Sequence, residues 1–167
     1  MKITTKSARE TQKIARGMAR EIIRAPRGRR ARVLALSGEL GAGKTTFTQG
    51  FAAALGVKEK IQSPTFVLMK IYQLKERTRN KRHGFKHLIH IDCYRIQSPK
   101  DLIHLGLKNL LRDRDAVILI EWADRIKKIL SRGTVRITFA HGSKQNQRRI
   151  AIDSPAGADL DIRKIKE

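Results

Sequence analysis

The sequence of 167 residues predicts a single α/β domain, built on a mixed, mostly parallel sheet with helices on both faces and an antiparallel hairpin. Two short, almost entirely apolar runs, residues 32–37 and 116–122, have the composition of buried parallel strands. Segments with apolar residues at helical spacing lie before and between these runs. Because strands alternate with helices along the chain, we expect one layered domain over residues 1–167.

The first helix is predicted over residues 7–25. Ser7 is its expected N-cap, Glu10 follows three residues later, and Pro26 ends the helix. Its apolar residues recur at helical spacing: Ile14, Met18, Ile22 and Ile23. The next two elements are the strand over residues 32–37 and a helix over residues 46–55, which Gly56 stops.

The second half of the chain contains the predicted antiparallel pair. Residues 66–74 and 86–92 are β-like, and a long basic connection, about residues 75–86, joins them. The remaining predicted elements, in chain order, are a helix opening at Ser98 with a break at Gly106, the strand 116–122, a helix over 124–130, and strands over 134–140 and 148–153. We expect residues 154–167 to form a flexible tail.

The charge is large and unevenly distributed. The chain has 37 Lys and Arg against 15 Asp and Glu, for a net charge of +22. Residues 1–32 carry +9, residues 75–90 carry +5 and residues 125–149 carry +8, while the rest nearly cancels. This pattern fits either a surface that faces a polyanion or a solvated coat, and the choice depends on whether the three stretches meet in space.

Composition also excludes several classes of protein. The longest apolar runs are far shorter than the ~20 residues that a membrane span needs. The N-terminal segment is charged and has no apolar core of the kind that secretory signals carry. The single cysteine, Cys93, excludes an intrachain disulfide framework and suits a reducing compartment. We therefore expect a soluble, cytoplasmic protein with no membrane partner.

Residues 38–45 carry the most specific motif. Gly-Glu-Leu-Gly-Ala-Gly-Lys-Thr fits the phosphate-binding pattern G-x-x-x-x-G-K-[ST], between a predicted strand and a predicted helix. The glycines let successive backbone N–H groups point inward, and the start of the helix adds its partial positive charge. Lys44 would reach the β- and γ-phosphates, and the Thr45 hydroxyl would bind Mg²⁺. The residues expected to hold the nucleotide are Glu39, Gly41, Ala42, Gly43, Lys44, Thr45 and Thr46.

Such a loop needs a second acid near the magnesium ion, and the chain offers two. Asp92 and Glu121 each follow an apolar run and would sit at the carboxyl end of a strand, where ligands gather in open α/β sheets. One could hold the metal while the other orients the attacking water. The residues alone leave open which acid takes which role.

Four segments together resemble the TsaE (YjeE) family, the small bacterial ATPase of tRNA threonylcarbamoyladenosine biosynthesis. They are residues 38–46, Ser63-Pro64-Thr65-Phe66, His90-Ile91-Asp92-Cys93-Tyr94-Arg95 and Glu121-Trp122. The resemblance covers roughly residues 5–153. It implies a P-loop NTPase-like sandwich that binds ATP and Mg²⁺.

The resemblance also implies roles for individual residues. Thr45 and Glu121 would hold Mg²⁺, and Asp92 would be the acid needed for hydrolysis. Thr65 would belong to a switch-like loop near the γ-phosphate. In the family's adenine pocket, Ala8 and Arg148 are the nearest matches.

The sequence departs from the family pattern in two places. The basic connection is long, and residues 142–147 lengthen the last hairpin close to the expected adenine contact at Arg148.

The family works with TsaD- and TsaB-type proteins, which transfer threonylcarbamoyl to adenosine-37 of tRNAs that read ANN codons. The resemblance therefore implies weak ATPase activity that resets this complex between turnovers, with tRNA contacted directly or through the complex.

Two other functions remain open from the residues. One is a P-loop small-molecule kinase, with the basic segment 75–86 as a lid over the phosphates. The other is an RNA-binding module in which ATP is only a structural ligand. Trp122 also keeps two interpretations, stacking on a base or an aromatic partner, or packing in the core.

Overall fold

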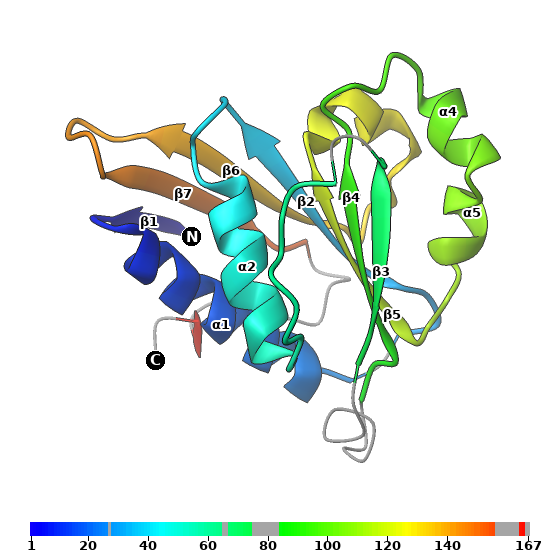
Figure 1. The fold of residues 1–167 in the computed structure, drawn as a ribbon. Helices are drawn as coiled ribbons and strands as arrows, with labels where there is room; N and C mark the ends of the chain where they lie inside the picture. The colour runs from blue at the N-terminus through cyan, green and yellow to red at the C-terminus, as the bar shows by residue number, and fades with distance from the viewer. Residues whose placement is uncertain (27, 65–66, 75–83, 156–163, 166–167) are drawn as a thin grey trace.

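The computed structural model describes residues 1–26, 28–64, 67–74, 84–155 and 164–165. They form a seven-stranded sheet in the order β1-β7-β6-β2-β5-β4-β3, with helices packed against it (Figure 1). The elements in chain order are β1 (Lys2–Thr5), α1 (Ala8–Arg24), β2 (Arg32–Gly38), α2 (Lys44–Ala54), β3 (Met69–Gln73), β4 (His87–Asp92), α4 (Pro99–His104), α5 (Leu107–Leu110), β5 (Ala116–Glu121), the 3₁₀ helix η1 (Ala123–Ile129), β6 (Val135–His141) and β7 (Arg148–Asp153). The predicted α/β fold is confirmed.

The sheet is mixed, and its pairings follow a simple pattern. The central neighbours β6–β2, β2–β5 and β5–β4 are parallel. The outer neighbours β1–β7, β7–β6 and β4–β3 are antiparallel, so the hairpin predicted for the two β-like segments is present as β3 and β4. Because the parallel strands all run the same way, the carboxyl ends of β2, β4 and β5 meet at one edge of the sheet.

Strand β1 was not predicted from the sequence. It has four residues, and it pairs with β7 in a register that sets Lys2 opposite Ala151 and Thr5 opposite Arg148. A strand this short has no recognisable apolar period of its own. These residues form a strand because they pair with β7, which lies almost 150 residues away in the sequence.

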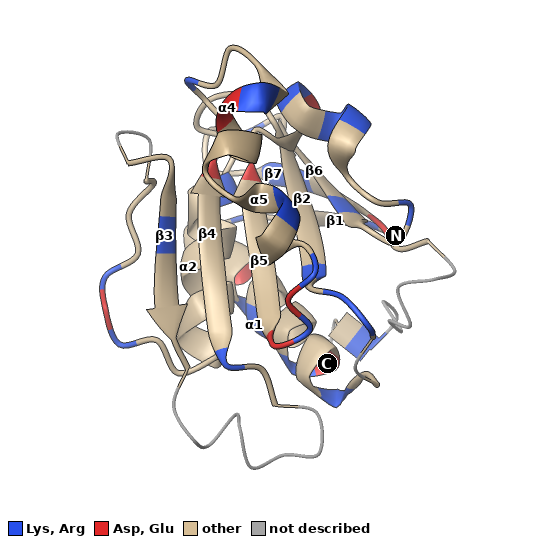
Figure 2. Ribbon diagram, turned by 90° about the vertical axis from the view of Figure 1, so that its right-hand side faces the viewer, with Lys and Arg blue, Asp and Glu red and all other residues tan. Residues whose placement is uncertain are grey.

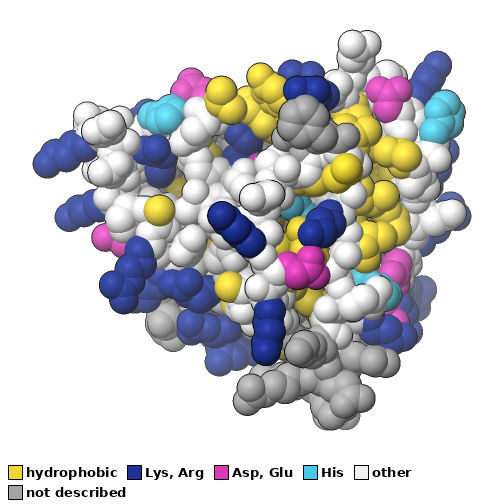
Figure 3. All heavy atoms as spheres, in the orientation of Figure 1, with side chains coloured by type: hydrophobic (Ala, Val, Ile, Leu, Met, Phe, Trp, Pro, Cys, Tyr) yellow, Lys and Arg dark blue, Asp and Glu magenta, His cyan; other side chains and the backbone are white. Residues whose placement is uncertain are grey.

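Helices lie on both faces of the sheet, as predicted. Helices α1 and α2 cover one face, and α4, α5 and η1 lie on the other, over β2, β5 and β4 (Figures 1 and 2). In β6, Val135 and Ile137 are buried toward α1 while Arg136 and Thr138 are exposed, so the described helices cover this half of the sheet on one face only. In the space-filling view, Lys and Arg side chains gather over α1 at the lower left (Figure 3).

The predicted helix caps are also present. The Ser7 hydroxyl accepts a hydrogen bond from the backbone N–H of Glu10 at 3.2 Å, and Ser98 forms a reciprocal capping box with Asp101. The segment predicted as a helix over 124–130 is η1, which follows Trp122 in a left-handed conformation (φ 57°). Among the described residues, no helix is long and apolar enough to cross a membrane.

Two predicted segments lie largely outside the described residues. They are the basic connection, described only from residue 84, and the tail, described only at 154–155 and 164–165. Of the tail, Ile165 is buried and lies directly against Gly17 of α1.

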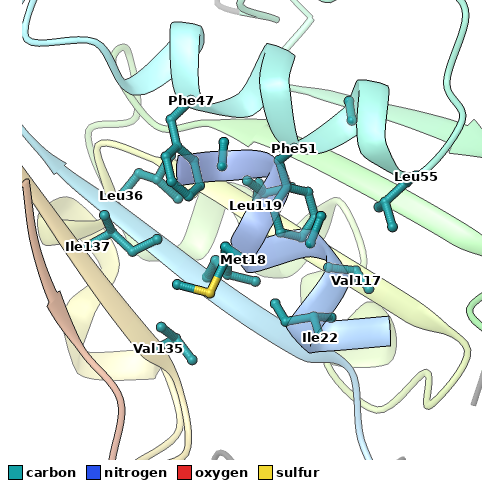
Figure 4. Close-up of a cluster of buried hydrophobic side chains, with 14 of the residues drawn as sticks. Met18, Ile22, Leu36, Phe47, Phe51, Leu55, Val117, Leu119, Val135 and Ile137 are labelled. Atoms are coloured by element: carbon teal, nitrogen blue, oxygen red, sulfur yellow. The ribbon is translucent and has the colours of Figure 1, made fainter. Parts of the chain in front are cut away.

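The larger hydrophobic core fixes α1 and α2 on the sheet (Figure 4). Met18 and Ile22 of α1 and Phe47 and Phe51 of α2 are all fully buried. The two helices approach closely at Gly50, where a Cβ atom would lie 2.6 Å from the Cα of Gln12. This contact holds the start of α1 beside the loop that leads into α2.

Candidate nucleotide site at the carboxyl ends of the central strands

The loop after β2 forms the floor of the site. It turns at Gly38, whose φ of 134° few other residues adopt and where a Cβ atom would overlap the carbonyl oxygen of Phe139. Helix α2 starts directly after Gly43, whose φ is 103° and which provides no side-chain cap. The first N–H groups of α2 therefore have no capping side chain to occupy them, and such groups bind anions.

Lys44 lies against the same loop. Its Nζ donates to the carbonyl oxygens of Gly38 at 2.7 Å and Glu39 at 2.8 Å, and it sits 3.8 Å from the centre of the Trp122 ring. Burial lowers the pKa of Lys44 below its usual value, and the nearby Glu121, Asp92 and Asp124 carboxylates partly oppose this shift. The ammonium group is thus held by backbone carbonyls and an aromatic face at the edge of the cleft.

Glu121, at the end of β5, is the centre of a buried hydrogen-bond network. Its Oε2 accepts from the Thr45 hydroxyl at 2.8 Å, and its Oε1 accepts from the Thr48 hydroxyl at 3.1 Å. The Nε2 of His90 lies 2.8 Å from the same Oε1. Both Glu121 and His90 are almost fully buried, so these partners compensate the loss of water around the carboxylate.

Asp92 occupies the equivalent place at the end of β4. The parallel register sets Asp92 opposite Glu121, and only 2% of Asp92 is exposed. Its carboxylate accepts from the backbone N–H of Tyr94 at 2.8 Å and from the Ser63 hydroxyl. The segment that begins at Ser63 is therefore held beside the strand end, although Thr65, the expected switch residue, lies outside the described residues.

These groups surround one cleft of about 460 Å³, a volume in the usual range for small-molecule sites. The cleft is lined by Leu40, Gly41, Gly43, Lys44, Thr45, Thr46, Ser63, Asp92, Tyr94, Glu121 and Trp122. The structure therefore brings together the loop and both candidate acids. Which acid binds metal and which orients water stays a prediction.

A smaller recess of about 110 Å³ shares Gly41, Gly43 and Thr46 with this cleft. It is lined by Ala8, Thr11, Gly41, Gly43, Thr46, Asn146 and Arg148. Ala8 and Arg148, the two residues matched to an adenine pocket, thus lie at one recess although 140 residues separate them. Arg148 donates from Nε to the carbonyl oxygen of Gly41 at 3.2 Å.

The two remaining loop residues have different surroundings. Ala42 is fully buried, and its backbone N–H donates to the carbonyl oxygen of Glu39. The side chain of Glu39 is exposed, and its carboxylate lies 3.9 Å from His141. Glu39 contacts Lys44 through its backbone carbonyl oxygen.

Trp122 lies at the wall of the cleft. It is half-buried, packs partly against the smaller core cluster, and stands 5.1 Å from the Tyr94 ring, centre to centre. Core packing therefore applies to part of this residue, and stacking on a base stays a prediction. Lys44 lies over the face of the Trp122 ring, and the Tyr94 ring is tilted by 51° against it.

Sequence reasoning missed His90 and Thr48 as members of the site. A single histidine within the apolar run 88–91 was the available signal for His90, because a buried polar side chain needs a partner. For Thr48 the signal was its position one helical turn after Lys44, whose carbonyl oxygen also accepts from the Thr48 hydroxyl at 3.1 Å. Neither signal identifies Glu121 as the partner.

Comparison with known proteins gives a consistent result. The family model described as "Threonylcarbamoyl adenosine biosynthesis protein TsaE" matches residues 5–150. A Treponema pallidum protein named tRNA threonylcarbamoyladenosine biosynthesis protein TsaE is 37% identical over 107 residues, which cover 64% of this chain and 71% of that protein. A Bacillus subtilis protein of the same name is 38% identical over 107 residues, covering 64% of this chain and 60% of the relative, less than two thirds of its length.

A solved structure matches over a longer range. The crystal structure of Bacillus subtilis YdiB superposes with a TM-score of 0.71 and 29% sequence identity, covering 95% of this chain and 88% of that one. The similarity therefore extends over nearly the whole fold.

Proposed function

This chain belongs to the TsaE family, and from that premise we propose that it is an Mg²⁺-dependent ATPase required for the threonylcarbamoyladenosine modification of tRNA at adenosine-37. In this proposal it acts in the cytoplasm with TsaD- and TsaB-type partners, and its hydrolysis of ATP resets their complex. The relatives named above are tRNA threonylcarbamoyladenosine biosynthesis proteins, which supports the pathway.

The hydrogen bond between Thr45 and Glu121 carries the proposal. It joins the loop hydroxyl to a buried carboxylate on a neighbouring strand at 2.8 Å, within the cleft. Hydroxyl and carboxylate oxygens are the ligands that Mg²⁺ prefers, so this donor set fits the ion. When bound, Mg²⁺ would neutralise charge that develops on the phosphate oxygens.

The other residues of the cleft have separable roles. Lys44 would exchange its two carbonyl partners for the β- and γ-phosphate oxygens, and the first N–H groups of α2 would bind the same phosphates. Asp92, oriented by Tyr94 and Ser63, would hold the attacking water and take up its proton. Ala8 and Arg148 would contact the adenine from the smaller recess.

A phosphate-release assay tests the activity. We expect the purified chain with ATP and Mg²⁺ to release inorganic phosphate slowly and to leave no phosphorylated acceptor. The matched variant Asp92→Asn should keep ATP affinity and lose hydrolysis. A phosphorylated small molecule in stoichiometric amount would instead establish a kinase, and ATP binding without any hydrolysis would favour a structural role for ATP.

A pull-down tests the partners. We expect the tagged chain to recover TsaD- and TsaB-type proteins from its native extract in an ATP-dependent manner, and the Lys44→Ala variant to recover less. Failure to recover either protein with ATP present would contradict the proposed complex.

A further inference from the structure

The exposed face of α1 carries a row of five cations. Arg9, Lys13, Arg16, Arg20 and Arg24 follow one another at intervals of three or four residues, so their side chains share one face of the helix. Arg16 is half-buried and the other four are exposed. We call these five residues the α1 cation row.

The orientation of the row is fixed by the core. The opposite face of α1 is buried against the sheet and α2 through Ile14, Met18 and Ile22. Because α1 cannot rotate without exposing these side chains, the cation row must face the solvent. The dark blue side chains at the lower left of Figure 3 lie where Figure 1 places α1.

The row is scarcely neutralised by the described part of the chain. Of its five members, only Arg24 has a described carboxylate within 4 Å, that of Glu21 at 3.0 Å. Like charges one turn apart destabilise a helix by about 0.2–0.5 kcal/mol per pair, and the row contains four such pairs. A bound polyanion would remove this repulsion.

We propose that the α1 cation row binds the phosphate backbone of RNA. From Arg9 to Arg24 the helix extends about 22 Å, a length that spans about six phosphates of one strand of a nucleic-acid duplex. Four of the five cations are arginines, whose planar guanidinium groups bind phosphate oxygens in pairs. The choice of RNA, and of tRNA in particular, rests on the proposed function, whereas the binding of phosphates rests on the row itself.

Two other occupants fit the row less well. A membrane-bound amphipathic helix inserts its apolar face, but the apolar face of α1 is already buried in the core. Protein interfaces usually centre on large apolar or aromatic side chains. The large hydrophobic side chains exposed among the described residues lie on other elements: Leu40, Val67, Ile71, Tyr94 and Leu105.

The row begins beside the nucleotide site. Arg9 follows Ala8, which lines the smaller recess together with Thr11. The close approach of Gln12 to Gly50 ties this end of α1 to the helix that leaves the phosphate-binding loop. RNA bound along α1 would therefore lie next to bound nucleotide without occupying its cleft.

A matched pair of variants tests the proposal. The row variant is Lys13→Gln/Arg16→Gln/Arg20→Gln, and the control is Lys127→Gln/Lys128→Gln/Arg132→Gln. All three control side chains are exposed; Lys127 and Lys128 belong to η1, on the other face of the sheet, and Arg132 follows it. Both lose three charges, and glutamine is compatible with a helix. Binding of transcribed tRNA is measured by fluorescence anisotropy at several salt concentrations, without ATP.

We expect the row variant to bind tRNA at least tenfold more weakly and to lower the slope of log K against log salt by about 2–3, as the loss of three phosphate contacts predicts. The control should change affinity less than threefold. Equal losses in both variants would show a net-charge effect and overturn the proposal. So would anionic phospholipid vesicles or polyglutamate that bound as tightly as tRNA at the same salt concentration.

The same variants separate this proposal from the proposed ATPase. Phosphate release without RNA should be unchanged in the row variant, because none of its three residues lines the cleft. Normal RNA binding with no hydrolysis in the parent protein would contradict the ATPase alone. Normal hydrolysis with no RNA binding would contradict the cation row alone.

Discussion

Two regions of the molecule carry many charged side chains: the cleft at the ends of β2, β4 and β5, and the outer face of α1. They differ in how far these side chains are buried and in whether they have partners. In the cleft, Lys44, Asp92 and Glu121 are each 5% exposed or less and have hydrogen-bond partners within 3.1 Å. On α1 the cations lie mostly in solvent, and Arg24 alone has a described carboxylate partner.

Because of this difference, removing a charge should have different effects on stability in the two regions. Removing one member of the cleft leaves its partner buried and unsatisfied, which is costly even before any ligand is bound. Removing Lys13, Arg16 or Arg20 from α1 takes a partner from no described carboxylate and slightly relieves repulsion within the helix, whereas removing Arg24 would take away the partner of the buried Glu21. We therefore expect the cleft charges to affect both folding and chemistry, and Lys13, Arg16 and Arg20 of α1 to affect mainly binding.

The largest effect is expected from Lys44→Ala. Loss of the cation that binds two phosphates should weaken ATP affinity about 1,000-fold, equivalent to about 4 kcal/mol. Titration with a fluorescent ATP analogue measures this, with Lys44→Met as a variant that keeps the apolar stem and should lose as much. Unchanged affinity in either variant would refute the assignment of the phosphate-binding loop.

A smaller effect is expected from Glu121→Gln, which keeps the shape but removes the charge. Hydrolysis at saturating ATP should fall about 100-fold, while ATP affinity without Mg²⁺ changes little. A Mg²⁺ titration of phosphate release measures this, with Asp92→Asn as the comparison. If Glu121→Gln kept normal activity at low Mg²⁺ and Asp92→Asn did not, the two acids would have the opposite roles.

A further effect is expected at His90, a buried polar side chain whose Nε2 contacts the Glu121 carboxylate. The replacement His90→Leu removes this partner and should raise the Mg²⁺ concentration for half-maximal hydrolysis about tenfold. His90→Gln, whose side-chain amide can donate to the same oxygen, should restore most of the difference. Similar Mg²⁺ requirements in all three proteins would show that His90 serves only the fold.

The smallest effect is expected from Cys93, a buried thiol that directly follows Asp92, because burial disfavours its charged form. Burial raises the pKa of this thiol to about 12, and the nearby Asp92 and Asp124 carboxylates add to the shift. The unfolded thiol ionises near pH 8.5, so the folded state keeps a proton that the unfolded state releases. Stability should therefore fall as the pH rises above about 8.5 toward 12.

Urea unfolding at pH 7.5 and 9.5 checks this expectation. Between these two values the parent protein should lose about 1 kcal/mol more than Cys93→Ala, which has no thiol to ionise. Native Cys93 should also react with thiol reagents far more slowly at pH 8 than the unfolded chain. An equal pH dependence in both proteins would show that the thiol ionises as readily folded as unfolded.

Much of the site could be predicted because its signals are local. The phosphate-binding loop is contiguous, and Asp92 and Glu121 each end an apolar run that is recognisable as a strand. The convergence of Ala8 and Arg148 came from resemblance to a family, since nothing in either segment points to the other. The contact between His90 and Glu121 was not predictable, because it depends on the register between β4 and β5.

The α/β class, the phosphate-binding loop and the amphipathic character of the first helix could all be predicted from the order of the amino acids. Each of these depends on residues within about 20 positions, where backbone preference and apolar spacing act directly. Three features became visible only in the folded chain: residues 2–5 form a strand, both acids reach one cleft, and the cations of α1 form a row facing solvent. Those features depend on strand register and on which helix face is buried, and both are settled by packing between distant segments.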